Sequence, residues 1–382
     1  MRDPSVSAAV TAPLILMTLM TSCAHAVEGG GIEFGGAVRF QYAYEDYDPG
    51  NKDRGGDVDF DTFRINVDGS LGEVILSGEW RYYQYMSVIH HAWIGYDFND
   101  HWQGQAGVTG VPFGVRPYNS HSYFFSSNFY LGLEDDYDAG VKALYAKGPW
   151  DVQLAFFKND ELGGVDGYVN DPSERYAYDV VGERDPAEGS FDDPANPIGE
   201  VNTFAGRVAY GFEHAAEART ELGVSALRGG LHDGTDGVGD YMAAAIHLNG
   251  DYGRWNLQLQ ATRYEYDLDS GNRRIAVGAY AYYDTIAAEA ATYTANLAYS
   301  LPVNWGPVSD LTFYNDHSLV TDKSAGLADT RMNVTGMAVT AGGVYAYFDY
   351  VVAENQPFVG GTMDATDGAT NRRFNIHVGY YF

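Results

Sequence analysis

The chain ends with the stretch FNIHVGYYF, residues 374–382, in which two rows of side chains alternate. The apolar row consists of Phe374, Ile376, Val378, Tyr380 and Phe382. The other row is mixed and includes Asn375 and His377. Successive side chains of a β-strand point to opposite faces, so this pattern predicts a strand with one apolar face. We expect this strand to close a sheet against the first strand of the chain, with its apolar row facing outward.

The first 26 residues have the features of a targeting segment. Arg2 gives a short charged region, residues 8–20 form an apolar run, and Ala24-His25-Ala26 matches a small-residue cleavage site. We predict a signal peptide over residues 1–26 and an exported domain over residues 27–382. Cys23, the only cysteine, lies in the predicted signal peptide, so cleavage would leave a mature chain without thiols. The alternative is a lipoprotein anchored through Cys23.

The composition excludes several classes of protein. Of the 382 residues, 31 are Tyr, 19 are Phe and 46 are Gly, which is typical of many short strands joined by tight turns. The formal net charge of −29 argues against nucleic-acid binding, which needs a basic surface, and against a basic anchor on an anionic membrane. After residue 27, no stretch approaches the roughly 18 apolar residues of a membrane helix.

Alternation of apolar and polar residues recurs in 17 segments between residues 36 and 382. Bacterial single-chain membrane barrels have an even number of strands, so we assign segment 274–284 to a loop or to the following strand. Short connections alternate with long ones, which are residues 45–57, 110–136, 158–201 and 353–371. This asymmetry is typical of outer-membrane barrels. We therefore predict an all-β fold: a transmembrane antiparallel β-barrel of 16 strands whose long third loop, residues 110–136, folds into the lumen.

Two stretches resemble known families. The terminal strand, with Tyr380 and Phe382, resembles the assembly signal of Gram-negative outer-membrane proteins. Together with the predicted signal peptide, strand count and loop asymmetry, it makes the whole mature chain similar to 16-stranded general porins. Residues 93–114, WIGYDFNDHWQGQAGVTGVPFG, are similar to a stretch of the phosphate-selective porin O and P family.

The resemblance implies a water-filled channel for passive diffusion of ions and small hydrophilic solutes in the Gram-negative outer membrane. It implies contacts with membrane lipid, lipopolysaccharide and the barrel-assembly machinery, and a homotrimer. It implies no enzymatic activity, no cofactor and no nucleic-acid partner. The alternatives are a porin selective for phosphate or oligosaccharide and, as a second alternative, an outer-membrane enzyme or an adhesion barrel. Only Ser122, His121 and Asp135 resemble catalytic residues, and their spacing does not indicate a nucleophile.

Charged residues suggest where a constriction would form. Loop 110–136 is rich in aromatic residues and ends in acidic ones, whereas basic residues occupy the inward rows of several predicted strands. An acidic loop opposite a basic wall would produce a field across the constriction and set ion selectivity. The candidate pore-lining residues are Arg39, Arg64, Glu79, Arg81, Arg116, Glu134, Asp135, Asp136, Lys142, Arg207 and Arg373. The excess of 52 acidic over 23 basic residues favours cation preference and argues against phosphate capture.

We predict no metal site. His90 and His91 are adjacent on a predicted strand, so we expect their side chains on opposite faces, where they cannot bind one metal ion together. Loose binding of divalent cations by acidic loops, such as residues 183–188 and Asp192-Asp193, remains an open alternative.

Overall fold

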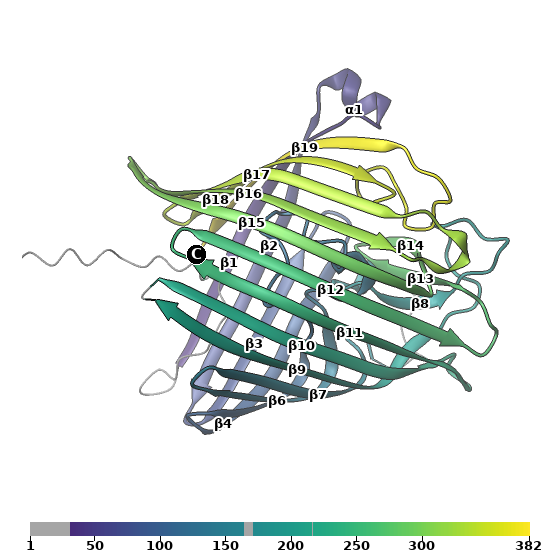
Figure 1. Cartoon of the computed structure of the whole chain (residues 1–382), viewed down its shortest axis with the longest axis horizontal. Helices are drawn as coiled ribbons and strands as arrows, with labels where there is room; N and C mark the ends of the chain where they lie inside the picture. The colour runs from purple at the N-terminus through teal and green to yellow at the C-terminus, as the bar shows by residue number, and fades with distance from the viewer. Residues whose placement is uncertain (1–30, 164–170, 216) are drawn as a thin grey trace, which may run out of the picture.

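The computed structural model describes residues 31–163, 171–215 and 217–382. The predicted signal peptide, residues 1–26, lies outside this part of the chain. Sixteen antiparallel strands form one closed barrel (Figure 1), as predicted. The barrel strands are β1 (Gly31–Glu45), β2 (Asp57–Leu71), β3 (Val74–Tyr82), β4 (Ser87–Asn99), β5 (Trp102–Gly110), β6 (Tyr137–Lys147), β7 (Trp150–Asp160), β9 (Gly199–Ala215), β10 (Ala218–His232), β11 (Gly237–Tyr252), β12 (Trp255–Leu268), β15 (Glu289–Trp305), β16 (Val308–Thr321), β17 (Thr330–Ala341), β18 (Val344–Glu354) and β19 (Thr370–Tyr381).

The remaining elements lie in connections between barrel strands. They are α1 (Pro49–Arg54), the 3₁₀ turns η1 (Phe129–Leu131), η2 (Pro172–Glu174) and η3 (Ser324–Gly326), and the short strands β8 (Asp179–Glu183), β13 (Arg274–Ala279) and β14 (Tyr282–Ala287). In the described part of the chain, no helix is long and apolar enough to cross a membrane.

The barrel closes where the last strand meets the first. Strand β19 pairs antiparallel with β1, with Phe40 opposite Val378. The amide of Phe382 donates to the carbonyl of Gly36, and the amide of Gly36 donates to the carbonyl of Phe382, at 3.1 and 2.9 Å. Only glycine fits at position 36, because an added Cβ would lie 2.3 Å from the carbonyl oxygen of Arg64. The expected closure is confirmed, and Phe382 is 59% exposed on the outside.

The two faces of the wall have the reverse polarity of a soluble protein. In β12 the buried row includes Gln258, Gln260 and Thr262, whereas the exposed row includes Trp255 and Leu259. The same outward apolar row recurs around the barrel, for example at Phe34, Ile94, Phe204, Ile246 and Tyr293. A soluble barrel would bury these side chains, so the arrangement suits an apolar solvent on the outside and a polar interior.

Long and short connections alternate, as predicted. Two-residue turns at 72–73, 100–101 and 148–149 alternate with the long connections 111–136 and 161–198. The connection 111–136, between β5 and β6, is called loop 3 below. Figure 1 shows β8, β13 and β14 at one end of the barrel and the C-terminus at the other.

Segment 274–284 is not a barrel strand, which confirms its assignment to a connection. It contributes to β13 and β14, which form a small three-stranded sheet with β8. The run that reads as one alternating strand is broken at Tyr280 and Ala281, which both have a φ of +55°. Residues with positive φ reverse the chain, so the two halves pair with each other instead of entering the barrel.

The small sheet, loop 3 and the barrel wall share one buried apolar cluster. Phe129 of loop 3, Val180 and Ile275 of the small sheet, and Leu231 and Tyr266 of the wall all belong to it. The aromatic rings of loop 3 therefore pack against the inner wall, as their composition suggests. The long-loop end of the barrel is consequently well packed.

Candidate functional site

Loop 3 is bonded to strands far from its own ends. The amide of Gly114 donates to Ser225 Oγ at 2.9 Å, and the amide of Val115 donates to Gln260 Oε1 at 2.8 Å. The Arg207 guanidinium donates to the Gly114 carbonyl at 2.8 Å. Gly114 has a φ of +61°, and an added Cβ would lie 2.3 Å from Gln260. The backbone of loop 3 can thus approach the wall closely only because this residue is glycine.

His121 provides the strongest anchor of loop 3. Its Nδ1 lies 2.8 Å from Asp316 Oδ1, and the amides of His121 and Ser122 donate to Asp316 Oδ2 at 2.7 and 2.8 Å. The other ring nitrogen lies 2.7 Å from Asn256 Oδ1. Burial by itself lowers the pKa of His121, but the Asp316 carboxylate outweighs it and raises the pKa above the usual value. Asp316 lies on β16, opposite β5 and β6 in the barrel, so loop 3 spans the barrel.

Glu134 holds loop 3 together internally. It accepts hydrogen bonds from the amide of Asn119 at 2.8 Å and from the amide of Ser126 at 3.1 Å. Burial raises the pKa of Glu134 to about 7, and these hydrogen bonds oppose the shift. Asn119 in turn accepts from Thr294 and Asn296 of β15. The Glu134 carboxyl thus fixes the shape of the loop that β15 receives.

The next two acidic residues of loop 3 also bond to nearby groups. Asp135 accepts from the hydroxyls of Tyr176 and Tyr137 at 2.6 and 3.0 Å, and Asp136 accepts from the amide of Tyr137 at 2.8 Å. Among the described residues, no arginine or lysine nitrogen lies within 4 Å of Glu134, Asp135 or Asp136. The structure therefore does not pair the acidic end of the loop with the basic wall residues.

The basic wall residues are nevertheless brought together. Arg39, Arg64 and Arg81 lie on the adjacent strands β1, β2 and β3, and Arg64 is directly opposite Arg81. Each has a carboxylate beside it: Arg39 lies 2.7 Å from Asp61, and Glu79 lies 3.5 Å from Arg64 and 2.5 Å from Arg81. These wall arginines therefore form a chain of ion pairs and not a free positive patch.

Two further wall arginines are also paired. Arg373 lies 3.0 Å from Glu45, and Arg207 lies 2.9 Å from Asp151 and bonds to Glu221 as well. Pairing with an acid on a neighbouring strand neutralises the charge of each and stiffens the wall.

Arg116 and Lys142 differ from the other candidates. Arg116 donates to the carbonyl of Val111 at 2.7 Å, and Lys142 donates to the carbonyl of Gly110 at 2.8 Å. Within the described chain, neither has a carboxylate oxygen within 4 Å. They are therefore the two basic candidates without a carboxylate partner in this part of the structure.

The expectation for the two histidines of β4 is wrong. Glu79 is opposite His91 and Trp80 is opposite Ile89, so His90 is an extra residue in a β-bulge. The bulge shifts the alternation by one residue, and His90 Nδ1 lies 2.8 Å from His91 Nδ1. Both imidazoles therefore lie on one side of the wall.

Two residues that hold loop 3, Asp316 and Asp349, are not among the candidates predicted from the sequence. Asp316 receives three hydrogen bonds, and Asp349 accepts from the amide of Tyr123 and the hydroxyl of Tyr314. Strand parity places both carboxylates on inward rows, which was the only available signal. The three residues considered as catalytic do not form a triad, because both ring nitrogens of His121 are bonded to Asp316 and Asn256.

No family model and no curated protein matches the sequence. Solved structures do match over nearly the whole chain. OmpT of Vibrio cholerae in its trimer form is 14% identical, with a TM-score of 0.53 over 92% of this chain and 99% of that chain. An anion-selective porin from Comamonas acidovorans is 13% identical, with a TM-score of 0.56 over 92% and 100%.

The outer-membrane channel DcaP of Acinetobacter baumannii is 12% identical, with a TM-score of 0.59 over 93% of this chain and 98% of that chain. At these identities the likeness concerns the fold. Together with the closed barrel and its polarity, these matches establish that the chain has the fold of the 16-stranded outer-membrane porins.

Proposed function

We propose that the chain is an outer-membrane porin that forms a water-filled channel for passive diffusion of ions and small hydrophilic solutes. The observation that carries the proposal is the reversed polarity of the wall, with Gln258 and Gln260 inward and Trp255 and Leu259 outward. The apolar outer face matches a lipid environment, and the polar inner row can solvate ions. In this proposal the candidate pore-lining residues lie along the permeation path, and no chemical reaction is catalysed.

We further propose a preference for cations. The wall arginines are neutralised by neighbouring acids, whereas Asp310 and Asp349 have no arginine or lysine within 4 Å among the described residues. Within the described ranges, the acidic end of loop 3 has no arginine or lysine partner either, so the unpaired carboxylates outnumber the two unpaired basic candidates, Arg116 and Lys142. The inner surface therefore keeps an excess of negative charge, in line with the net charge of −29. Counter-ions accumulate near such a surface, so cations are expected to carry most of the current.

The conductance is expected to be small for a barrel of 16 strands. Loop 3, the small sheet and the inner wall share one buried cluster at the long-loop end. The path must therefore pass beside this packed region, and its width depends on how firmly loop 3 is held.

A substrate-selective porin is the second candidate, and Arg116 and Lys142 favour it. These two basic residues lie on loop 3 and on β6, where, among the described residues, they bond to backbone carbonyls at 2.7 and 2.8 Å and to no carboxylate. An unneutralised pair of cations can bind phosphate or another anion. In that case selectivity would come from this pair and not from the overall charge.

The homotrimer is also part of the proposal. A hollow of about 380 Å³ lies on the outer face of β2 to β5. It is lined mainly by Val67, Leu76, Gly78, Ala92, Ile94 and Ala106. Small outward residues allow a second copy to approach closely, and lipid and lipopolysaccharide would cover the rest of the outer face. The exposed Tyr380 and Phe382 would be recognised by the barrel-assembly machinery in the Gram-negative outer membrane.

The test is single-channel recording of the refolded mature chain in a planar bilayer, with the reversal potential measured under a KCl gradient. Ohmic steps with cation preference support the proposal. Steps with anion preference that disappears in the double variant Arg116→Gln, Lys142→Gln support the second candidate instead. A folded barrel that conducts no ions contradicts the channel itself.

A further inference from the structure

Three buried carboxylates from three different elements meet beside loop 3. They belong to Asp136 at the end of loop 3, Asp138 of β6 and Asp179 of β8. One oxygen from each lies within 4.8 Å of the other two, and the residues are 8%, 3% and 4% exposed. Two oxygens that bind one Ca²⁺ at about 2.3–2.6 Å lie at most about 5 Å apart. The spacing is therefore suitable for one shared ion.

The charge of this group is not balanced by the side chains around it. Arg175 lies 2.7 Å from Asp179, but it also pairs with Asp160 at 2.7 Å and with Glu161 at 3.0 Å. No basic side chain lies within 4 Å of Asp136 or Asp138 in the described ranges. One guanidinium is thus shared by Asp179 and two carboxylates outside the group, and buried charges need a nearby partner.

Asp138 supplies the second, independent indication of a ligand. Its Oδ1 is buried and has no hydrogen-bond partner. Buried carboxylate oxygens are almost always bonded, because an unpaired one loses its hydration without compensation. A bound cation would satisfy this oxygen, whereas a hydrogen-bonded structural aspartate would already have a donor.

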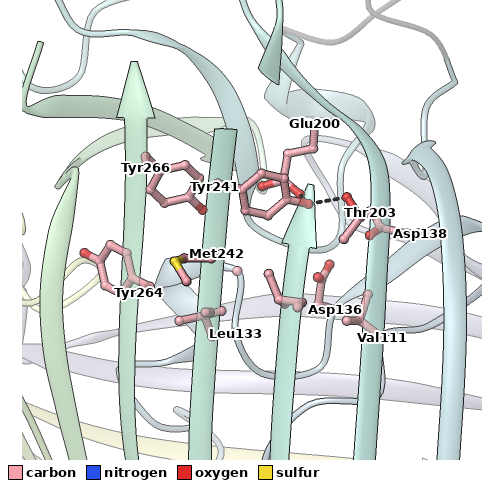
Figure 2. Close-up of a pocket in the computed structure, with 13 residues that line it drawn as sticks. Val111, Leu133, Asp136, Asp138, Glu200, Thr203, Tyr241, Met242, Tyr264 and Tyr266 are labelled. Atoms are coloured by element: carbon pink, nitrogen blue, oxygen red, sulfur yellow. Dashed lines mark hydrogen bonds between the residues drawn. The ribbon is translucent and has the colours of Figure 1, made fainter. Parts of the chain in front are cut away.

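A cavity opens on two of these three residues, Asp136 and Asp138 (Figure 2). It has a volume of about 10 Å³ and is lined by Asp136, Asp138, Glu200, Thr203 and Tyr241, among others. This volume fits about one water-sized occupant. Glu200 adds a fourth carboxylate, which accepts from Tyr241, and the Tyr241 and Thr203 hydroxyls are hydrogen-bonded to each other. The donors at the cavity are oxygens, which hard cations prefer.

We propose that Asp136, Asp138 and Asp179 bind one Ca²⁺ ion beside this cavity, where the nearby Glu200 carboxylate adds negative charge. Carboxylates alone select a hard cation over zinc or copper, which favour histidine and cysteine. The flexible coordination of Ca²⁺ suits ligands that come from three elements, whereas Mg²⁺ demands near-ideal octahedral geometry.

The site would join three parts of the molecule. Asp136 ends loop 3, Asp138 belongs to the barrel wall, and Asp179 belongs to the small sheet. A bound ion therefore fixes the loop and the sheet to the wall at one point. This role does not depend on channel activity, because binding is measured on the folded protein without any transport.

The experiment measures metal binding to the refolded mature chain after chelation. Equilibrium dialysis with radioactive Ca²⁺ should give one ion bound per chain. Tb³⁺, which replaces Ca²⁺ at oxygen sites, should emit when excited through tyrosine, since Tyr241 and Tyr266 line the same cavity. Added Ca²⁺ should quench this emission by competition. A wild-type chain that binds no Ca²⁺ stoichiometrically would overturn the proposal.

Variants locate the ion. Asp138→Asn keeps the side-chain shape and should weaken Ca²⁺ binding by about tenfold or more, because the site loses a charged ligand. Asp349→Asn is the matched control, since Asp349 is also buried, inward and bonded to loop 3, but through Tyr123. It should bind Ca²⁺ as the wild type does. Equal Ca²⁺ affinity in Asp138→Asn and the wild type would overturn the assignment even if both fold.

Discussion

Single carboxylates decide how loop 3 is held. Asp316 receives the Nδ1 proton of His121 and two backbone amides, and it lies on the far side of the barrel from the loop's ends. Asp349 accepts from the amide of Tyr123 in the same way. Each is a buried acceptor for donors that would otherwise be unsatisfied. The position of the loop therefore depends on a few inward aspartates.

Replacing Asp316 should release the loop. Asp316→Ala removes the partner of His121 and leaves two amides without an acceptor, which should cost about 3–5 kcal/mol. We expect a lower free energy of unfolding, with larger and noisier single-channel steps. Asn315→Ala is the matched control, because Asn315 is the next residue and is exposed on the outward row. Identical recordings from the two variants would contradict the anchoring role.

The closure of the barrel between β1 and β19 depends on how closely whole strands approach one another. Gly36, which bonds to Phe382 at the β1–β19 seam, leaves no room for a side chain. An added Cβ would lie 2.3 Å from the Arg64 carbonyl oxygen of β2 and 2.8 Å from the ring of Phe382. At Gly78 in β3 the nearest atom would be 3.8 Å away. The same substitution therefore has different consequences at two strand glycines.

Gly36→Ala should weaken the seam, while Gly78→Ala should be tolerated. The first change forces the backbones of β1 and β2 apart, and a bad contact of this kind typically costs about 1–3 kcal/mol. We expect Gly36→Ala to lower the midpoint of thermal unfolding in detergent and to reduce the folded fraction on a heat-modifiability gel. Equal midpoints for the two variants would show that the close approach at the seam has no energetic cost.

Asp284 of the small sheet should make stability depend on pH. It accepts from Thr362 and from the amide of Met363 at 3.2 Å, which ties residues 355–369 to the sheet. Burial raises the pKa of Asp284 to about 7, although these hydrogen bonds oppose the shift. An acid whose pKa is higher in the folded than in the unfolded chain stabilises the fold less as pH rises. The free energy of unfolding should therefore fall between about pH 4 and pH 7, by up to the order of 4 kcal/mol.

The measurement is denaturant unfolding at a series of pH values. Asp284→Asn should reduce the slope of the pH profile, because the amide does not ionise; the slope that Glu134 contributes should remain. Asp236→Asn, which changes an exposed loop carboxyl, should leave the slope unchanged. If Asp284→Asn kept the full slope, another group would have to be the origin of the dependence.

The barrel wall has an apolar outward row, and this can be tested without any transport assay. Ile246 is 63% exposed near the middle of β11. At an exposed position surrounded by water, replacing isoleucine by lysine would leave the free energy of unfolding almost unchanged. A lysine that faces the middle of a bilayer instead lowers the stability by about 2–4 kcal/mol. We expect Ile246→Lys to lower stability in lipid vesicles by that amount, whereas Thr235→Lys in an exposed loop should not. A neutral Ile246→Lys variant would argue against the lipid-facing band.

Much of this architecture could be predicted from the sequence, because a period of two reports which residues share a face. The terminal strand and the outward apolar row follow from that pattern. The exclusion of 274–284 from the barrel follows instead from the even strand number of bacterial membrane barrels. The contacts of loop 3 could not be predicted, since His121 and Asp316 are 195 positions apart and the loop has no period. The bulge at His90 shows a second limit of prediction from the sequence, because one extra residue in a strand reverses which of the following side chains face inward.

The seam between β1 and β19 has a consequence for biosynthesis. The first and last strands of the described chain are neighbours. Residue 40 of β1 therefore cannot pair with residue 378 of β19 until residue 378 has been synthesised. Until then both strands present open edges, to which any other extended chain can add. In a nascent or truncated chain that lacks β19, the other barrel strands cannot form the closed barrel, because β19 links β18 to β1. Holding such chains unfolded until translation ends is therefore a requirement that this topology places on the cell.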